Sequence, residues 1–353
     1  MCGRVGQLAC DHCWPGRTGG GGGHPVSASA PVNHELLYFG KLPSRGDFVR
    51  SSHHGALIEH LDRWQSQTME RLATDPRWKL RYDAAPPVQF AILGTASCVG
   101  LAGHWRASQD TSGRRFPFIT ACSFDVATPR TFPDVAPVAL ARIWGRLDQV
   151  SGVAHAATDL SHAQASLQAP VSHDLPEAVA RGVLQEFLDT HTVASLEQML
   201  AASGAKVCVR QATLALGLLL QPVMSQGAGR LSKALCLPLV HDASLRGSVA
   251  AFWLSLVLGF FRRHDVELGL YLVSHEGLTH LVIGFQGASP ATLSTLIDPY
   301  TLAQEAVSVN QAEWVEDEVQ TDYGLRKLSN YLRDPGLSLS QALAIYQEVF
   351  LGV

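Results

Sequence analysis

The sequence VQFAILGTASCVGLAGHWRASQDTSGRRFPFITACSF, residues 88–124, determines the fold class that we predict for the first half of the chain. Within it, Val88–Leu93 and Cys98–Trp105 are short apolar runs that are typical of strands. The polar turn Gln109–Gly113 then leads into Phe116–Phe124, where large residues alternate with others as in a half-buried strand. Three successive strands joined by short connections predict an antiparallel sheet.

Further elements surround this predicted sheet. Leu36–Gly40 has the composition of a short buried strand, and Pro137–Leu147 has a helical pattern. A single helical stripe is formed by Leu57, Leu61, Trp64, Thr68 and Leu72. The first half is therefore predicted to be an α/β (α+β) unit, an antiparallel sheet flanked by helices, which we place at residues 34–152.

Composition shifts mark the boundaries of this unit. Residues 1–33 contain five consecutive glycines, Gly19–Gly23, and no apolar run, so we predict a disordered Gly-rich tail. Residues 153–172 are rich in Ala, Ser and His and weakly patterned, and we predict that they form a linker.

The second half, residues 173–353, is predicted to be a mostly helical α+β domain that contains one hairpin. The hairpin is expected where Leu268–Val273 and Leu278–Phe285 flank a polar turn. Ala205–Leu220 is compatible with a strand or a helix. Further helices are expected at 175–188, 193–202 and 248–263, after Ser289-Pro290, and from the capping box of Ser338 and Gln341.

Composition excludes several classes of protein. Of the 353 residues, 46% are hydrophobic and 16% are charged, so the chain is expected to fold around a sizeable core. The net charge of −4 gives no support for nucleic-acid binding, which needs clustered positive charge. Seven scattered cysteines favour a reducing, cytoplasmic compartment. The apolar run Ser248–Phe261 is shorter than the about 20 residues of a membrane span, so we expect a buried helix and no membrane insertion.

Catalytic and metal-binding patterns are weak in this sequence. His275 and His280 are five residues apart, whereas a zinc-protease helix places its two histidines four apart. Ser203-Gly204-Ala205-Lys206 lacks the companion motifs of acyl-transfer enzymes. Cys10 and Cys13 lack the second pair that a structural zinc site usually has. We therefore predict no catalytic residues, no metal and no cofactor.

Two loops carry unusual charge for so apolar a chain. One holds Lys41, Arg45, Asp47 and Arg50, and the other is Asp110–Pro117. Charged loops on an apolar scaffold are typical recognition sites, but an ion pair that joins the two loops explains the charges equally well. In the first loop we expect a positive backbone dihedral at Gly46 and backbone amides donating to the Asp47 carboxylate.

These segments together resemble a known family. Phe39–Phe48 (FGKLPSRGDF), Leu61–Trp64 (LDRW) and Asp110–Pro117 (DTSGRRFP) resemble, in this order, the signatures of the TagF (ImpM-like) proteins associated with type VI secretion. The resemblance implies a cytoplasmic accessory protein without catalytic activity. It also implies that the protein represses assembly of the secretion system after translation, by binding a forkhead-associated (FHA) scaffold protein.

The resemblance and the charged loops together give a set of candidate residues. We expect Trp64, Phe116 and Pro117 to be structural. A double variant, Arg45→Glu with Arg114→Glu, is expected to abolish capture of the scaffold and to leave the fold intact. The candidate partner-binding residues are Lys41, Arg45, Gly46, Asp47, Phe48, Asp110, Gly113 and Arg114.

The alternative is a small-molecule-binding or hydrolytic domain with a pocket between the two halves. Such a site needs polar groups that converge in one cleft. Cys98, Cys122 and His104 flank the same predicted strands and are its best candidates. The oligomeric state is left open by the sequence.

Overall fold

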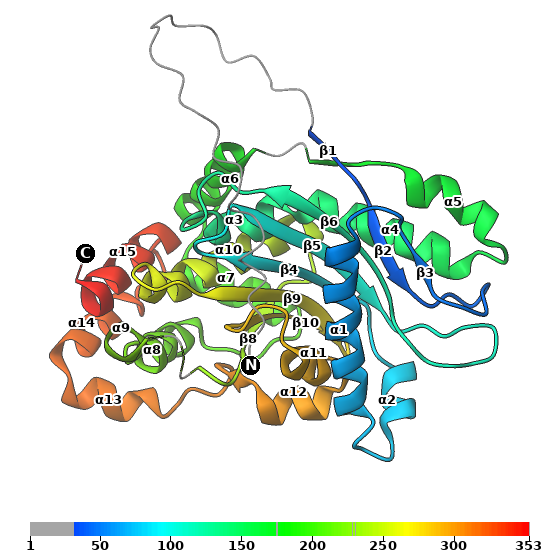
Figure 1. Cartoon of the computed structure of the whole chain (residues 1–353). Helices are drawn as coiled ribbons and strands as arrows, with labels where there is room; N and C mark the ends of the chain where they lie inside the picture. The colour runs from blue at the N-terminus through cyan, green and yellow to red at the C-terminus, as the bar shows by residue number, and fades with distance from the viewer. Residues whose placement is uncertain (1–31, 174–175, 228, 230, 353) are drawn as a thin grey trace, which may run out of the picture.

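A nine-stranded sheet runs through the described part of the chain, which in this computed structural model comprises residues 32–173, 176–227, 229 and 231–352. Its strand order is β11-β8-β10-β9-β4-β5-β6-β2-β3, and Figure 1 shows it crossing the centre of the molecule. The strands are β2 (Leu37–Gly40), β3 (Val49–Arg50), β4 (Val88–Gly94), β5 (Val99–Arg106), β6 (Phe118–Asp125), β8 (Leu235–Leu239), β9 (Glu267–His275), β10 (Leu278–Gly284) and β11 (Val307–Ser308).

The predicted strands of the first half and the predicted hairpin of the second half are present. β4, β5 and β6 pair antiparallel, as expected, and β9 and β10 form the hairpin. β6 differs from the prediction in burial, because Ile119 and Ala121 are as deeply buried as Thr120 and Cys122. Helices cover both faces of the sheet, so this strand is buried on both sides rather than on one.

The sheet does not stop at the predicted domain boundary. β4, from the first half, pairs antiparallel with β9, from the second half, between Val88↔Val273 and Gly94↔Glu267. Thr95 extends this seam, since its backbone N–H donates to the carbonyl oxygen of Val266 at 2.9 Å. Both halves of the chain therefore contribute strands to one mixed sheet, and among its described strands only β11 and β8 pair in parallel.

The predicted linker at residues 153–172 is wrong. Its first residues continue α4 (Ala141–Ala156), and most of the rest form α5 (Leu160–Gln168). α5 begins at an N-cap, because the Asp159 side chain accepts a hydrogen bond from the backbone N–H of Ser161. β7 (Val171–His173) follows and pairs with β1 (Val32–His34) outside the large sheet. The weak hydrophobic pattern of this stretch thus belongs to a surface helix.

Helices form a layer on each face of the sheet (Figure 1). One face carries α1 (Gly55–Leu72), α11 (Pro290–Ile297) and α12 (Pro299–Glu305), with α2 (Trp78–Asp83) at its margin. The other face packs on α4 and α10 (Ala243–Leu258). The remaining helices are α3 (Phe132–Ala139), α6 (Glu177–Thr190), α7 (Val193–Ala202), α8 (Val209–Leu220), α9 (Val223–Gln226), α13 (Val315–Thr321), α14 (Tyr323–Tyr331) and α15 (Leu339–Leu351).

α10 is the predicted apolar helix. Together with the 3₁₀ turn Gly259–Phe261 it is long and apolar enough to cross a membrane, judged by length and composition alone. However, 67% of its most apolar window is buried inside the protein. Trp253 is fully buried and its Nε1–H donates to the carbonyl oxygen of Pro238 in β8 at 2.9 Å. These contacts are those of a core helix.

Two smaller predictions also have an outcome. The predicted tail extends to residue 33, but Val32 and Asn33 belong to β1; residues 1–31, with Cys10 and Cys13, lie outside the described residues. The ambiguous segment 205–220 is helical from Val209 onward, as α8.

Candidate functional site

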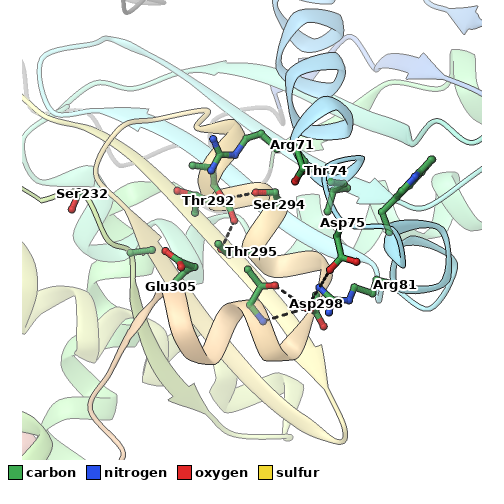
Figure 2. A pocket seen from close by; sticks show the side chains of 15 residues that line it. Arg71, Thr74, Asp75, Arg81, Ser232, Thr292, Ser294, Thr295, Asp298 and Glu305 are labelled. Atoms are coloured by element: carbon green, nitrogen blue, oxygen red, sulfur yellow. Dashed lines mark hydrogen bonds and ion pairs between the residues drawn. The ribbon is translucent and has the colours of Figure 1, made fainter.

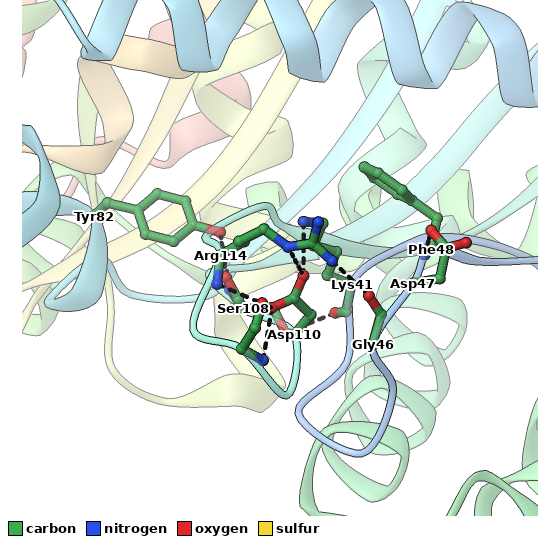
Figure 3. Close-up of polar contacts among 9 residues, drawn as sticks. Lys41, Gly46, Asp47, Phe48, Tyr82, Ser108, Asp110 and Arg114 are labelled. Atoms are coloured by element: carbon green, nitrogen blue, oxygen red, sulfur yellow. Dashed lines mark hydrogen bonds and ion pairs between the residues drawn. The ribbon is translucent and has the colours of Figure 1, made fainter.

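The two charged loops lie side by side and are joined by a buried ion pair. Lys41 Nζ donates to Asp110 Oδ2 at 2.9 Å, and the two residues are 7% and 2% exposed. Lys41 directly follows β2, and Asp110 lies in the connection between β5 and β6, so the pair joins segments about 70 residues apart in sequence. Figure 3 shows Asp110 at the centre of the contacts. The alternative that an ion pair joins the loops is therefore correct, with Lys41 rather than an arginine as its buried cation.

Asp110 is held by more than this one partner. Its Oδ1 accepts from the backbone N–H of Ser112 at 3.0 Å, from Ser112 Oγ at 2.7 Å and from the backbone N–H of Arg114 at 3.0 Å. Its Oδ2 also accepts from Arg114 Nε at 2.7 Å. Burial alone raises the pKa of this carboxyl, but the hydrogen bonds from Ser112, Lys41 and Arg114 outweigh burial and hold its pKa well below the usual range.

Two backbone contacts complete the junction between the loops. Arg114 Nη2 donates to the carbonyl oxygen of Gly46 at 2.6 Å, and the backbone N–H of Thr111 donates to the carbonyl oxygen of Arg45 at 3.0 Å. The tip of the first loop is therefore fixed by the second loop, although both tips are exposed.

Tyr82 of α2 holds the start of the second loop through hydrogen bonds to Ser108. Tyr82 Oη donates to the carbonyl oxygen of Ser108 at 3.0 Å, and the backbone N–H of Ser108 donates back to Tyr82 Oη at 2.9 Å. Ser108 Oγ then donates to the carbonyl oxygen of Lys41 at 2.7 Å. Burial raises the pKa of Tyr82 well above its usual value, so the phenol stays protonated and keeps its donor. Neither Tyr82 nor Ser108 was predicted, because nothing in the sequence signals this contact over 26 residues.

An aromatic cluster supports the first loop. The Phe48 ring stacks on Phe39 with a centroid separation of 5.5 Å and meets Phe116 edge-on at 4.9 Å. Lys41 Nζ lies 5.1 Å from the Phe48 centroid. Phe48 nevertheless remains 43% exposed, whereas Phe116 is 9% exposed. The cluster therefore presents one face of an aromatic ring to solvent.

The structure divides the predicted partner-binding residues into two groups. Lys41 and Asp110 are buried in this structure, so their side chains lie beneath the surface rather than on it. Gly46 has no positive φ, contrary to expectation, whereas Gly113 has a φ of 79°. Asp47 Oδ1 does accept a backbone hydrogen bond, from Phe48 at 2.8 Å. The exposed residues, which we call the two-loop face, are Arg45, Gly46, Asp47, Phe48, Gly113 and Arg114.

The expected structural residues are all buried. Trp64 belongs to α1 and is 4% exposed, and its ring meets Phe90 of β4 edge-on at 5.3 Å. Pro117 precedes β6, and its carbonyl oxygen accepts from the backbone N–H of Lys41 at 3.3 Å. Phe116 and Pro117 therefore hold the two loops together from the core side.

The Asp110 junction makes stability depend on pH in one direction. The pKa of Asp110 is lower in the folded protein than the about 3.9 of an unfolded chain, so its contribution is complete at neutral pH and is lost as pH falls below about 4. We expect Asp110→Asn to lower the urea midpoint clearly at pH 7, because Lys41 then stays buried without its carboxylate, and the deficit to shrink between pH 4 and pH 3.

Asp83→Asn is the matched control for this measurement. Asp83 receives two hydrogen bonds from Arg115, at 2.7 and 2.6 Å, but its side chain is 48% exposed, so solvent screens the pair. Its effect on the urea midpoint should be the smaller one. Equal midpoints for wild type and Asp110→Asn at pH 7 would contradict the structural role of Asp110.

The residues named for a catalytic alternative do not converge. Cys98 is exposed, whereas Cys122 is buried and burial raises the pKa of its thiol to about 12. His104 is 1% exposed, and its Nε2 lies 3.0 Å from Asp148 Oδ1 on α4. None of the three lines the cavity that lies between elements of the two halves. In the part of the chain that the structure describes, no group of three or more His, Cys, Asp or Glu side chains is placed to hold a metal ion.

A cavity of about 450 Å³ does lie between elements of the two halves. Figure 2 shows Arg71 of α1 beside hydroxyl-bearing residues of α11, whereas Arg81 of α2 lies beside Asp298. Arg81 Nη1 bridges Asp75, at 3.0 Å, and Asp298, at 2.8 Å. Asp298 also caps α12, accepting from the backbone N–H of Thr301 at 3.3 Å. The charges at this end of the cavity thus pair with one another and join α2 to α12.

Comparison with known proteins identifies the domain that carries the two loops. The family described as TagF N-terminal domain, type VI secretion system-associated, matches residues 38–170. Residues 38–170 are therefore similar to a TagF N-terminal domain, as the sequence signatures indicated. The TagF N-terminal domain includes both loops, α1 and the strands β4 to β6, and it continues through α5 beyond the predicted boundary at residue 152.

The other comparisons add little information to the match with the TagF N-terminal domain. No curated protein matches the sequence. Among solved structures, the crystal structure of PA0076 from Pseudomonas aeruginosa PAO1 at 2.05 Å resolution matches with 22% sequence identity and a TM-score of 0.33. The match covers 40% of this chain and 66% of the PA0076 chain, which is just under two thirds of it.

Proposed function

We propose that this protein is a non-catalytic, cytoplasmic accessory protein that represses assembly of a type VI secretion system after translation. In this proposal it binds an FHA scaffold protein through the two-loop face. One observation carries the proposal: two signature segments of the TagF N-terminal domain form one braced surface with exposed arginines and an exposed aromatic ring.

The chemistry of the two-loop face suits protein binding. Arginine and aromatic side chains supply most of the binding energy in protein interfaces, and Arg45, Phe48 and Arg114 are exposed on this face. Of the exposed ionisable residues, Arg45 and Arg114 are cationic and Asp47 is anionic. A partner surface with acidic groups around an apolar recess would complement this arrangement.

The bracing of the loops also favours tight binding. Association costs free energy when loops must be ordered. Here the Lys41–Asp110 pair and the contact of Arg114 with Gly46 hold both loops in place before a partner arrives. The charges buried beneath the face therefore serve to preorganise it, and the charges on its surface would serve recognition.

The structure changes which variants test this proposal best. Arg114 supports the fold of both loops, and a carboxylate at position 114 would face the buried Asp110. Arg45 is exposed, and its described hydrogen bonds are made by its backbone. We expect Arg45→Glu and Phe48→Ala each to weaken scaffold binding about tenfold or more, because each removes a central contact. Arg45→Glu does so without removing a support of the loop, whereas Phe48→Ala also removes one ring of the aromatic cluster.

Affinity capture and isothermal titration with the FHA scaffold protein of the same secretion system measure these effects. Arg263→Glu, the same charge reversal at an exposed position between η3 (Gly259–Phe261) and β9, is the matched control and should bind normally. Urea unfolding of each variant verifies the fold. Wild-type affinity in the double variant Arg45→Glu, Phe48→Ala would remove the two-loop face from the interface.

A further inference from the structure

A second, apolar cavity lies away from the two loops, between α1 and the end of the sheet. It has a volume of about 300 Å³, which is in the range of small-molecule sites. Its walls are Ala56, Leu57, His60, Leu61 and Trp64 of α1, together with His54, Ile92, Gly94, Ser97, Val99, Gly100, Leu101, Ser123, Glu267 and Ala288.

The sheet supplies an apolar floor to this cavity. Ile92 of β4 pairs with Leu101 of β5, which pairs with Ser123 of β6, so the three side chains lie in one row on the face that α1 covers. Val99, one row further out, is 42% exposed. Leu57 and Leu101 are only half-buried, so apolar surface remains uncovered along the cavity.

The carboxylates at and near the cavity, those of Glu267 and Glu35, carry negative charge. Among the described residues that line the cavity, Glu267 is the only Asp, Glu, Lys or Arg. Within the described residues its carboxylate takes part in no ion pair. A further carboxylate, Glu35 Oε2, lies 3.2 Å from Nε2 of the lining residue His54.

The backbone fixes the position of Glu267. It opens β9 and pairs with Gly94 of β4, and its carbonyl oxygen accepts from the backbone N–H of Gly287 at 2.8 Å. A Cβ atom at Gly287 would lie 3.0 Å from Glu267 Oε2, so the carboxylate rests against a loop that has no side chain there. The charge is thus held at the end of the cavity formed by β9 and the loop that follows β10.

We propose that this cavity binds a small apolar molecule that carries a positive charge. The apolar body lies between α1 and the row of Ile92 and Leu101, and the cation faces Glu267. This site is separate from the two-loop face and does not depend on the proposed scaffold binding. An apolar wall with a few placed polar groups is the usual design of a small-molecule pocket, and the unpaired carboxylate selects the sign of the ligand's charge.

Three indoles that differ only in the group attached to the ring test this proposal on the full chain. At pH 8 tryptamine is cationic, 3-methylindole is neutral and indole-3-acetate is anionic. Titration calorimetry or ligand-observed NMR should give tryptamine a Kd on the order of 0.1–1 mM, the range expected for a ligand of this size. Tryptamine should bind at least tenfold more tightly than indole-3-acetate.

Two variants separate the cavity from its charge. Ala56→Trp places a large ring at the exposed rim and should abolish binding of all three probes. Glu267→Gln should weaken tryptamine about tenfold and leave 3-methylindole unchanged. Glu186→Gln, the same change at an exposed position of α6, is the matched control and should bind as the wild type does.

The proposal is overturned if no probe saturates the wild-type protein or if binding survives Ala56→Trp with the fold intact. It is also overturned if indole-3-acetate binds as tightly as tryptamine, because the carboxylate would then have no part in selection. Selective loss of tryptamine binding in Glu267→Gln supports it even if Ala56→Trp fails to fold.

Discussion

Gly40→Ala, directly before the first loop, should destabilise the protein more than any single substitution within the two loops. Gly40 ends β2 with a φ of 133°, a backbone conformation that residues with a side chain rarely adopt. A Cβ atom there would lie 1.9 Å from the carbonyl oxygen of Pro117 and 2.8 Å from the Cα of Phe118. Both are backbone atoms at the start of the adjacent strand β6. Strain and collision together predict a loss of at least about 3 kcal/mol in the free energy of unfolding.

Urea unfolding followed by circular dichroism measures this loss, and Gly46→Ala is its control in the same loop. Gly46 has an ordinary φ, and the nearest atom to its added Cβ is Thr111 Oγ1 at 3.4 Å. That variant should stay within about 0.5 kcal/mol of the wild type. Similar stabilities for Gly40→Ala and Gly46→Ala would show that β2 and the segment before β6 do not approach as closely as described.

Residues 32–170 expressed alone should fail to fold as a soluble monomer. In the whole protein β4 pairs on both sides, with β5 and with β9, and five of its seven residues are buried. Without β9 its backbone groups become an unpaired apolar edge, which favours aggregation. The opposite face also loses α10, which packs on α3.

Sedimentation and thermal unfolding of this fragment test the expectation, with residues 32–353 as the folded control. Co-expression with residues 171–353 should restore a soluble complex, because the missing strand is then supplied by the second fragment. A monomeric 32–170 fragment that unfolds cooperatively would contradict the dependence of the first half on the second.

The sequence predicts well those elements whose signals are local. α1 follows from a helical stripe that includes Leu61 and Trp64, and both residues are buried as expected. β4, β5, β6 and the β9–β10 hairpin follow from apolar runs between turns. The two charged loops were also recognised from local composition, and they do lie together.

Pairing between distant segments has no such local signal. β8 was missed because Pro238 interrupts its run, and the structure tolerates it since the short β11 pairs only with Leu235 and Cys236. The seam of β4 with β9 depends on residues far apart in the chain. For the same reason the sequence showed charges at Lys41 and Asp110 but could not show that they are buried against each other.

The pairing of β4 with β9 limits how early the sheet can form while the chain is being synthesised. Gly94 and Glu267 face each other across it, with about 170 residues between them, and contacts over such separations slow folding. At about 5–20 residues per second, a ribosome delivers β9 on the order of 10–30 s after β4. The middle of the sheet therefore stays open until synthesis has passed β9, and until then β4 lacks one of its two neighbouring strands.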